Sequence, residues 1–276
     1  MCVNYTPSSR TELIDNFKAH VSDDSLWPEE TYQDYLAPII RSVEGQRQAC
    51  AASYGMVPKS HMPPGVKRFT TMNARSETVG SLRSYSAAWK AGQLCLVPMS
   101  RFFEPNWESG THERWQIRRA DAEAFAVAGL WRTWNEPDGS MSLSFTQLTI
   151  NADEHPMMRR FHKLGDEKRS LVIVPANDYD DWLTCRDPEQ ARSFLRLYPA
   201  DKMIASPAPK PPRISRGSVR SRCNSVWFDR ASLFKLETRL AIKVARRHRR
   251  VVAQTSIQFT SLPKVKSSLF AVNAYD

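Results

Sequence analysis

The stretch at residues 94–105, LCLVPMSRFFEP, is the best guide to the fold because it contains a clear strand pattern. The same stretch also contains a candidate functional group. Leu94 to Val97 is a short apolar run with a β-branched residue, which is typical of a buried strand. Just past this run stands Glu104, between two phenylalanines and a proline. A glutamate after an apolar strand is more often a salt-bridge partner than a catalytic group, so Glu104 needs support from other segments.

Comparable runs recur through the middle of the chain. Short apolar or alternating segments predict further strands at residues 51–57, 125–130, 145–150 and 171–174. Helix signals are fewer: a capping box predicts a helix over residues 9–20, and an Asp-Pro start predicts another over residues 187–197. Strands therefore dominate, and we expect an α+β domain with a mostly antiparallel, barrel-like β core and flanking helices.

Composition narrows the class of protein. Of the 276 residues 41% are hydrophobic, which is enough for a core. No segment approaches ~18 uninterrupted apolar residues, and the start lacks a secretory signal pattern, so we expect no membrane span. The 5 cysteines form no CxxC pair, which argues against a disulfide framework or a zinc site and for a reducing compartment. We therefore expect a cytoplasmic monomer without metal or cofactor.

The net charge of +10 is unevenly distributed. Residues 210–276 hold 15 of the 39 Lys and Arg but 3 of the 29 Asp and Glu, which leaves 24 basic and 26 acidic residues before them. Residues 206–213, SPAPKPPR, have the composition of a linker. We therefore expect one domain at residues 1–206, followed at 207–276 by a Pro-rich linker and a basic tail that is disordered or partly helical. A non-covalent DNA-binding module, with affinity supplied by the tail, is one possible function.

The second residue carries chemistry of its own. The chain begins Met-Cys-Val-Asn, and trimming of Met1 would leave Cys2 with a free α-amine beside its thiol. These groups titrate near ~8 and ~8.5, so both have a reactive fraction at neutral pH. The amine condenses with an aldehyde to an imine, and the thiol then closes a five-membered thiazolidine ring. A cysteine placed by chance on a frayed terminus is the plainer explanation, so the rest of the chain must decide.

Seven segments, taken together and in order, resemble one family, the SOS response-associated peptidase (SRAP) domain. The resemblance covers about residues 1–206 and implies the SRAP fold. It also implies a sensor of abasic sites in single-stranded DNA, which crosslinks itself to the ring-opened sugar aldehyde through its N-terminal cysteine. The segments are Met1-Cys2, Ala37-Pro38, Tyr54-Gly55-Met56-Val57-Pro58, Asn73-Ala74-Arg75-Ser76-Glu77-Thr78, Cys95-Leu96-Val97-Pro98 with Phe103-Glu104, Ala128-Gly129-Leu130-Trp131, and His162 before Leu171-Val172-Ile173.

The resemblance implies catalytic roles for four matching residues. Cys2 is the nucleophile that forms the crosslink, and Asn73 holds it by hydrogen bonds. Glu104 accepts a proton from the Cys2 amine and returns it to the departing hydroxyl. His162 moves the proton that opens the sugar ring, because the pKa of a histidine lies near the operating pH.

The resemblance also implies a DNA-binding set. Arg75 and Arg169 are suited to phosphates beside the lesion, and Tyr54 stands where the family usually has a tryptophan that can stack on a base. Three places depart from the family pattern: Val3-Asn4 replaces Gly-Arg, Tyr35 replaces a common asparagine before Ala37-Pro38, and residues 162–169, HKLGDEKR, replace a His-Asp-Arg run. These departures concern DNA contacts and leave the four catalytic candidates in place.

A second activity stays open on the same residues. Cys2, Glu104 and His162 also suit an N-terminal-nucleophile cysteine peptidase or amidase, and the family name reflects a proposed peptidase activity. Autoproteolytic removal of Met1 or of a short leader fits either activity. The two differ in what they need: an aldehyde on DNA requires the α-amine, whereas a thiol peptidase requires only the sulfur.

Overall fold

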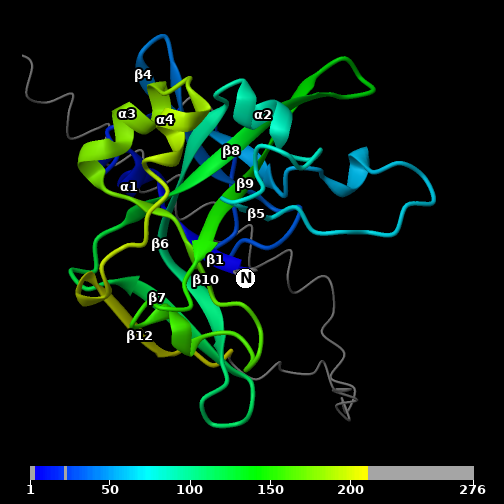
Figure 1. The fold of residues 1–276 in the computed structure, drawn as a ribbon. Helices are drawn as coiled ribbons and strands as arrows, with labels where there is room; N and C mark the ends of the chain where they lie inside the picture. The colour runs from blue at the N-terminus through cyan, green and yellow to red at the C-terminus, as the bar shows by residue number, and fades with distance from the viewer. Residues whose placement is uncertain (1–3, 22–23, 211–276) are drawn as a thin grey trace, which may run out of the picture. The chain divides into compact units, whose positions relative to one another are not determined.

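The computed structural model describes residues 4–21 and 24–210 (Figure 1). The chain divides into two units at residue 211, and everything described below belongs to the first. The predictions for Cys2 and for the linker and tail beyond residue 210 therefore lie outside the described residues.

Strands dominate the described residues. The helices are short: α1 (Arg10–Asp15), α2 (Ser86–Lys90), α3 (Tyr179–Thr184) and α4 (Pro188–Arg192), with 3₁₀ turns η1 (Lys59–His61), η2 (Met158–Arg160), η3 (Ala176–Asp178) and η4 (Ala200–Lys202). The strands are β1 (Asn4–Pro7), β2 (His20–Val21), β3 (Leu36–Val43), β4 (Gln46–Tyr54), β5 (Asn73–Arg75), β6 (Leu94–Asn106), β7 (Glu113–Arg119), β8 (Phe125–Asn135), β9 (Met141–Asn151), β10 (Arg169–Leu171), β11 (Ile173–Val174) and β12 (Met203–Pro207).

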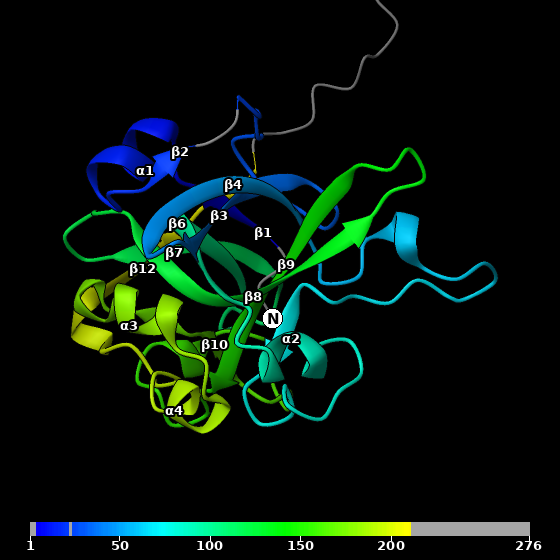
Figure 2. The same ribbon diagram turned by 90° about the horizontal axis from the view of Figure 1, so that it is seen from above.

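Within this part of the chain, five strands close a ring. Their order is β8, β9, β4, β3 and β6, and β6 pairs back to β8. The pairs around the ring are antiparallel except β4 with β9, which is parallel. The helices lie outside the ring (Figure 2). The predicted α+β class with a mostly antiparallel, barrel-like core is therefore confirmed.

Strand β6 explains why its sequence pattern is so apolar. Leu94 and Leu96 belong to the core that also contains side chains of the helices, whereas Cys95 and Val97 belong to the core that includes the interior of the ring. Successive side chains of a strand point to opposite faces, so a strand buried on both faces reads as an unbroken apolar run. The indole nitrogen of Trp182 on α3 donates to the carbonyl of Cys95 at 2.8 Å, which holds α3 against the outer face of β6.

The same strand is much longer than its apolar run. Its second half is paired on both sides: Asn4 of β1 lies opposite Phe103, and Trp115 of β7 lies opposite Glu104. Glu104 is therefore inside β6, and the prediction that it follows the strand is wrong. Pairing with two neighbours continues a strand through polar residues where sequence pattern alone ends it.

Other helices and strands also end at residues different from those predicted. The helix at residue 10 is capped by Ser9 and Glu12 as expected but ends at Asp15, because the chain turns into β2 at His20. The helix at residue 188 likewise ends at Arg192. The run at 171–174 forms parts of two strands, since β10 pairs with β9 and β11 pairs with β8.

The last described strand covers the predicted end of the domain. Residue 206 lies inside β12, where Pro207 is opposite Trp115 of β7, and the amide of Ala208 donates to the carbonyl of Arg114 at 2.9 Å. Among the residues described here, no helix is long and apolar enough to span a bilayer.

Candidate functional site

The buried pair Glu104 and His162 forms the centre of the candidate site. Glu104 comes from the paired second half of β6 and is 3% exposed, and His162 follows η2 and is 8% exposed. Oε2 of Glu104 lies 3.1 Å from Nε2 of His162. Neither ring nitrogen of His162 makes a well-aligned hydrogen bond to a described residue, so the pair is a close contact rather than a locked bond. A carboxylate and an imidazole this close, shielded from water, can exchange a proton.

The backbone of His162 is held in an unusual conformation. Its φ is +66°, in the left-handed region that non-glycine residues seldom adopt. The amide of His162 donates to the carbonyl of Pro105 at 2.9 Å, and Phe161 forms a β-bridge with Asn106. Lys168 donates from Nζ to the carbonyl of His162 at 3.1 Å. The end of β6 and Lys168 therefore fix the backbone of His162 beside Glu104, and strain of this kind is common where geometry serves a function.

His162 borders a cleft of about 680 Å³. Arg160 in this cleft donates to both oxygens of Glu108, at 3.0 and 2.8 Å. Its hydrogen bonds, with one from Asn106, lower the pKa of Glu108 to about 2. No sequence motif predicted this cleft, although the adjacent arginines before Phe161-His162 were a signal. Its other lining residues include Trp107, Arg159, Leu164 and Lys168.

The first described residue lies beside this pair. Asn4 is opposite Phe103, the neighbour of Glu104 in β6. The Asn4 side chain is buried and donates to Glu30 Oε2 at 2.9 Å and to the Tyr32 hydroxyl at 3.3 Å. The beginning of β1 is therefore anchored next to the carboxylate of the site, while Cys2 itself precedes the described residues.

Asn73 belongs to the short strand β5. Strand β5 runs parallel to β9, with Asn73 opposite Gln147. The carbonyl of Asn73 accepts a hydrogen bond from the Tyr85 hydroxyl at 3.2 Å. Gln147 is linked in turn to Tyr54, whose ring lies edge-on to Tyr5 of β1 at 5.4 Å between centroids. This series of contacts joins Asn73 to β1 through the interior of the ring.

Tyr54 does not present its ring to a ligand in this structure. It is fully buried, stacked on Phe145 at 5.1 Å with an interplanar angle of 17°, and its hydroxyl donates to Gln147 Oε1 at 3.0 Å. The Tyr54 ring is thus enclosed by the core here, and stacking on a DNA base stays a prediction. The sequence placed an aromatic residue correctly at the end of β4 but did not reveal that it points into the core.

Arg169 is likewise turned inward. Its side chain is 3% exposed and makes a forked pair with Glu77, at 3.0 and 2.8 Å. It also donates to the carbonyl of Thr149 at 2.7 Å. Burial opposes ionisation of Glu77, but the hydrogen bonds and charge of Arg169 outweigh it and lower the pKa of Glu77 to about 2. In this structure Arg169 joins β10 to the segment after β5, and a contact of Arg169 with a phosphate stays a prediction.

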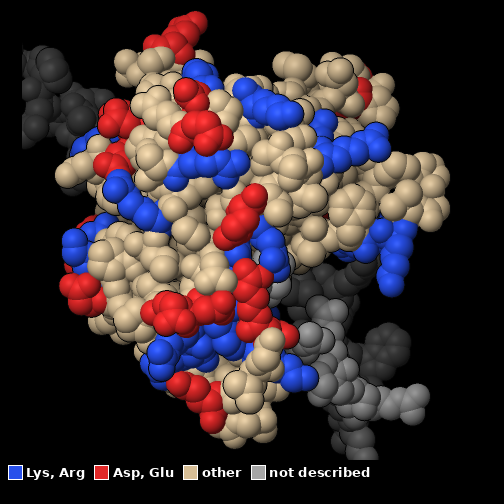
Figure 3. All heavy atoms as spheres, in the orientation of Figure 1, with Lys and Arg blue, Asp and Glu red and all other residues tan. Residues whose placement is uncertain are grey.

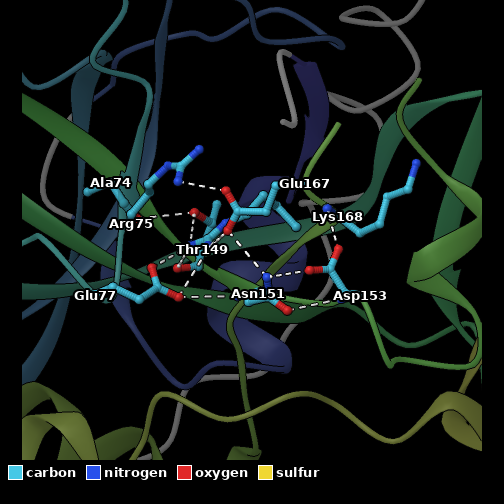
Figure 4. Close-up of polar contacts among 9 residues, drawn as sticks. Ala74, Arg75, Glu77, Thr149, Asn151, Asp153, Glu167 and Lys168 are labelled. Atoms are coloured by element: carbon cyan, nitrogen blue, oxygen red, sulfur yellow. Dashed lines mark hydrogen bonds and ion pairs between the residues drawn. The ribbon is translucent and has the colours of Figure 1, made fainter. Parts of the chain in front are cut away.

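Arg75 remains accessible. It is the last residue of β5, its side chain is 48% exposed, and Nη1 lies 2.6 Å from Oε2 of Glu167 (Figure 4). Of the predicted phosphate ligands, Arg75 is the one whose position suits a solvent-exposed strand of DNA. The described residues contain no group of three or more His, Cys, Asp or Glu arranged to hold a metal ion.

A sequence model of the SOS response associated peptidase (SRAP) family matches residues 1–211. The chain belongs to this family. Abasic site processing protein YoqW of Bacillus subtilis (strain 168), and the protein of that name from Bacillus phage SPbeta, are each 28% identical to it over 151 residues, which is 52% of this chain and 64% of theirs. Abasic site processing protein YobE of Bacillus subtilis (strain 168) is 29% identical over 140 residues, 50% of this chain and 60% of its own. The matches thus span less than two thirds of these SRAP relatives.

Solved structures share the SRAP fold described above. A crystal structure of a protein from Bordetella bronchiseptica is 34% identical, with a TM-score of 0.68, and the match covers 76% of this chain and 100% of that one. A crystal structure of a protein from Bacteroides thetaiotaomicron is 17% identical, with a TM-score of 0.60, and the match covers 75% of this chain and 92% of that one. At this identity the likeness shows a shared fold and nothing more.

Proposed function

We propose that this protein processes abasic sites in single-stranded DNA, and that Cys2, freed by removal of Met1, forms a covalent thiazolidine crosslink with the sugar aldehyde. Membership of the SRAP family and relatives named as abasic site processing proteins support the substrate. The observation that carries the proposal is the buried contact of Glu104 with His162 beside the start of β1.

Chain length supports the part assigned to Cys2. Consecutive Cα atoms are about 3.8 Å apart, so residue 2 cannot be more than roughly 7 to 8 Å from the Cα of Asn4. Asn4 lies opposite Phe103, next to Glu104. The proposal requires the α-amine of a trimmed Cys2 to come within reach of the Glu104 carboxylate, a distance that two residues of chain can cover.

The chemistry uses both nucleophiles of one residue. His162 moves the proton that opens the closed sugar, and the Cys2 amine attacks the aldehyde carbon to give a carbinolamine. Glu104 takes a proton from the Cys2 amine and returns it to the carbinolamine hydroxyl. This hydroxyl leaves as water, and an imine remains. The Cys2 sulfur then adds to the imine carbon, and its proton passes to the nitrogen. The second step is intramolecular, so it is favoured over hydrolysis of the imine.

The cleft gives the DNA a place to lie. Arg159 and Lys168 line it as cations, and Trp107 offers a half-buried ring on which a base can stack. Arg75 adds a half-exposed guanidinium on β5. These groups contact backbone and bases without a sequence code, as a lesion sensor requires.

The decisive test is intact mass before and after incubation with a single-stranded oligonucleotide that carries one abasic site. We expect a starting mass without Met1 and a heat-stable adduct of protein plus oligonucleotide minus one water. Cys2→Ala should give no stable adduct. Cys2→Ser and Cys2→Ala both keep the α-amine but lack the thiol, so each should give only an imine that borohydride can trap. A stable adduct with Cys2→Ala, or none with the trimmed protein, would contradict the proposal.

Replacement of His162 tests the proton transfer. We expect His162→Ala to slow crosslinking by roughly 10²- to 10⁴-fold, the usual contribution of a general acid–base group, without abolishing it. The aldehyde also forms unaided, so a slow adduct remains. A single-turnover rate equal to that of the unaltered protein would remove His162 from the mechanism.

A second candidate, a cysteine peptidase, is favoured by the same pair and by the description of the family. An imidazole held by a carboxylate can activate a thiol that lies next to it. Protein whose α-amine is acetylated while its thiol stays free separates the two activities. Crosslinking needs the amine and should be lost, whereas cleavage of a peptide substrate should persist.

A further inference from the structure

The segment between His162 and β10 is anchored at its end. The amide of Lys168 donates to Asp153 Oδ1 at 2.8 Å, and its Nζ donates to the carbonyls of His162 and Lys163 at 3.1 and 2.9 Å. Glu167 precedes this anchor, and its placement beside β9 and β5 is therefore set by the fold (Figure 4).

Glu167 uses its two carboxylate oxygens differently. Oε1 accepts from Arg169 Nη1 at 2.7 Å and from Asn151 Nδ2 at 3.4 Å, while Oε2 pairs with Arg75 Nη1 at 2.6 Å. Arg169 is buried and also held by Glu77, so it stays in place. Arg75 is half exposed, so it is the partner that can turn away.

We propose that Glu167 is an internal competitor for the DNA phosphate that Arg75 binds, and that it thereby determines the affinity of this site for a DNA strand. A carboxylate and a phosphate offer a guanidinium similar pairs of oxygens, so the two bind Arg75 in exclusive ways. An exposed ion pair such as Glu167 with Arg75 contributes little free energy. A phosphate positioned to pair with Arg75 can therefore displace Glu167, whereas a phosphate positioned elsewhere cannot. The inference rests on the proposed function, of which it specifies one DNA contact.

The charge on Glu167 supports this role. Burial raises the pKa of Glu167, but hydrogen bonds and charge from Arg169, with the charge of Arg75, outweigh it, so the pKa is lowered. The competitor is therefore ionised at neutral pH. Acidic and basic side chains are interleaved on the face of the molecule in Figure 3 rather than gathered in one basic field. Arg75 is thus partly neutralised before DNA arrives.

The test measures non-covalent binding of an undamaged oligothymidylate by fluorescence anisotropy at low salt. Glu167→Gln keeps an oxygen for Arg169 but removes the charge opposite Arg75, and we expect it to bind roughly three- to tenfold more tightly. Asp166→Asn, on the same segment, controls for the loss of one negative charge and should change affinity less than twofold. Arg75→Gln should weaken binding, and adding Glu167→Gln to it should restore almost nothing.

Each outcome decides. Equal effects of Glu167→Gln and Asp166→Asn, or a Glu167→Gln effect that persists beside Arg75→Gln, would overturn the inference, because then only bulk charge matters. If Glu167→Gln melts below the assay temperature, all variants are measured at a lower temperature at which each is folded. Oligothymidylate has no aldehyde, so this measurement is independent of crosslinking. An adduct with no gain in affinity refutes the inference alone, and a gain without an adduct refutes the crosslink alone.

Discussion

At the scale of single residues, Tyr54 shows how a buried aromatic side chain can hold a site without touching its ligand. Its hydroxyl meets Gln147, which is fully buried and opposite Asn73. We expect Tyr54→Phe to lower the free energy of unfolding by about 1–3 kcal/mol, because the buried amide oxygen loses its donor. Urea denaturation measures this change, and DNA affinity should stay the same. Tyr35→Phe, at an exposed position, is the control. An unchanged free energy of unfolding would contradict this account of the Tyr54 hydroxyl.

The pair of Glu77 with Arg169 predicts a dependence of stability on pH. The folded pKa of Glu77, about 2, is below its ordinary value of 4.5. Its contribution is therefore fully present above pH 4.5 and is lost as the pH falls toward 2. Glu77→Gln should be less stable at neutral pH and should lose less stability between pH 4.5 and 2 than the unaltered chain. Thermal melts across this range test it, with Glu189→Gln, an exposed pair with Arg192, as control. Parallel acid limbs for Glu77→Gln and the unaltered chain would contradict it.

Residue types were easier to predict from the sequence than residue environments. Glu104 and His162 were both singled out, and the structure brings them together. Tyr54 and Arg169 were assigned to DNA, yet both are buried. A side chain suited to stacking or to phosphate binding is equally suited to a core contact or an internal ion pair. Which it makes depends on the face of the strand, and that follows from long-range pairing.

At the scale of elements, Gly129 shows why β8 can pass close to its neighbours. A Cβ at this position would lie 2.8 Å from the carbonyl oxygen of Thr146 and 2.9 Å from both Cys95 Sγ and Val97 Cγ2. We expect Gly129→Ala to lower the free energy of unfolding by about 1–3 kcal/mol, the usual effect of overpacking. Gly80→Ala, whose Cβ would come no closer than 3.3 Å to its nearest neighbour, Trp89 Cδ1, should lower it by less than Gly129→Ala does. Equal denaturation midpoints for the two variants would refute this steric account.

Strand existence was predictable, but strand ends were not. The apolar runs at 94–97, 125–130 and 145–150 each lie inside a strand, β6, β8 and β9. All three strands are longer than their runs because the flanking residues pair with neighbouring strands: those of β6 with β1 and β7, and those of β8 and β9 with each other. The closure of β6 on β8 and the parallel pairing of β4 with β9 involve no local pattern at all.

At the scale of the whole molecule, the family match ends near residue 211, whereas the surplus of positive charge lies beyond residue 209. We expect removal of residues 212–276 to leave the single-turnover crosslinking rate at saturating protein unchanged. Affinity for undamaged single-stranded DNA at low salt should fall by roughly tenfold or more, and its salt dependence should become shallower. Titrations at several salt concentrations test this. A truncated chain with unaltered salt dependence would exclude a role of these residues in DNA binding.

The double pairing of β6 has an evolutionary consequence. Its second half carries Glu104 between β1 and β7, so a change of length there would shift two registers at once. The segment at residues 163–168, by contrast, is a surface connection between His162 and β10, where insertions are readily accommodated. Sequence variation that adapts such a protein to different DNA is therefore expected to accumulate in residues 163–168, next to the Glu104–His162 pair, rather than in the second half of β6.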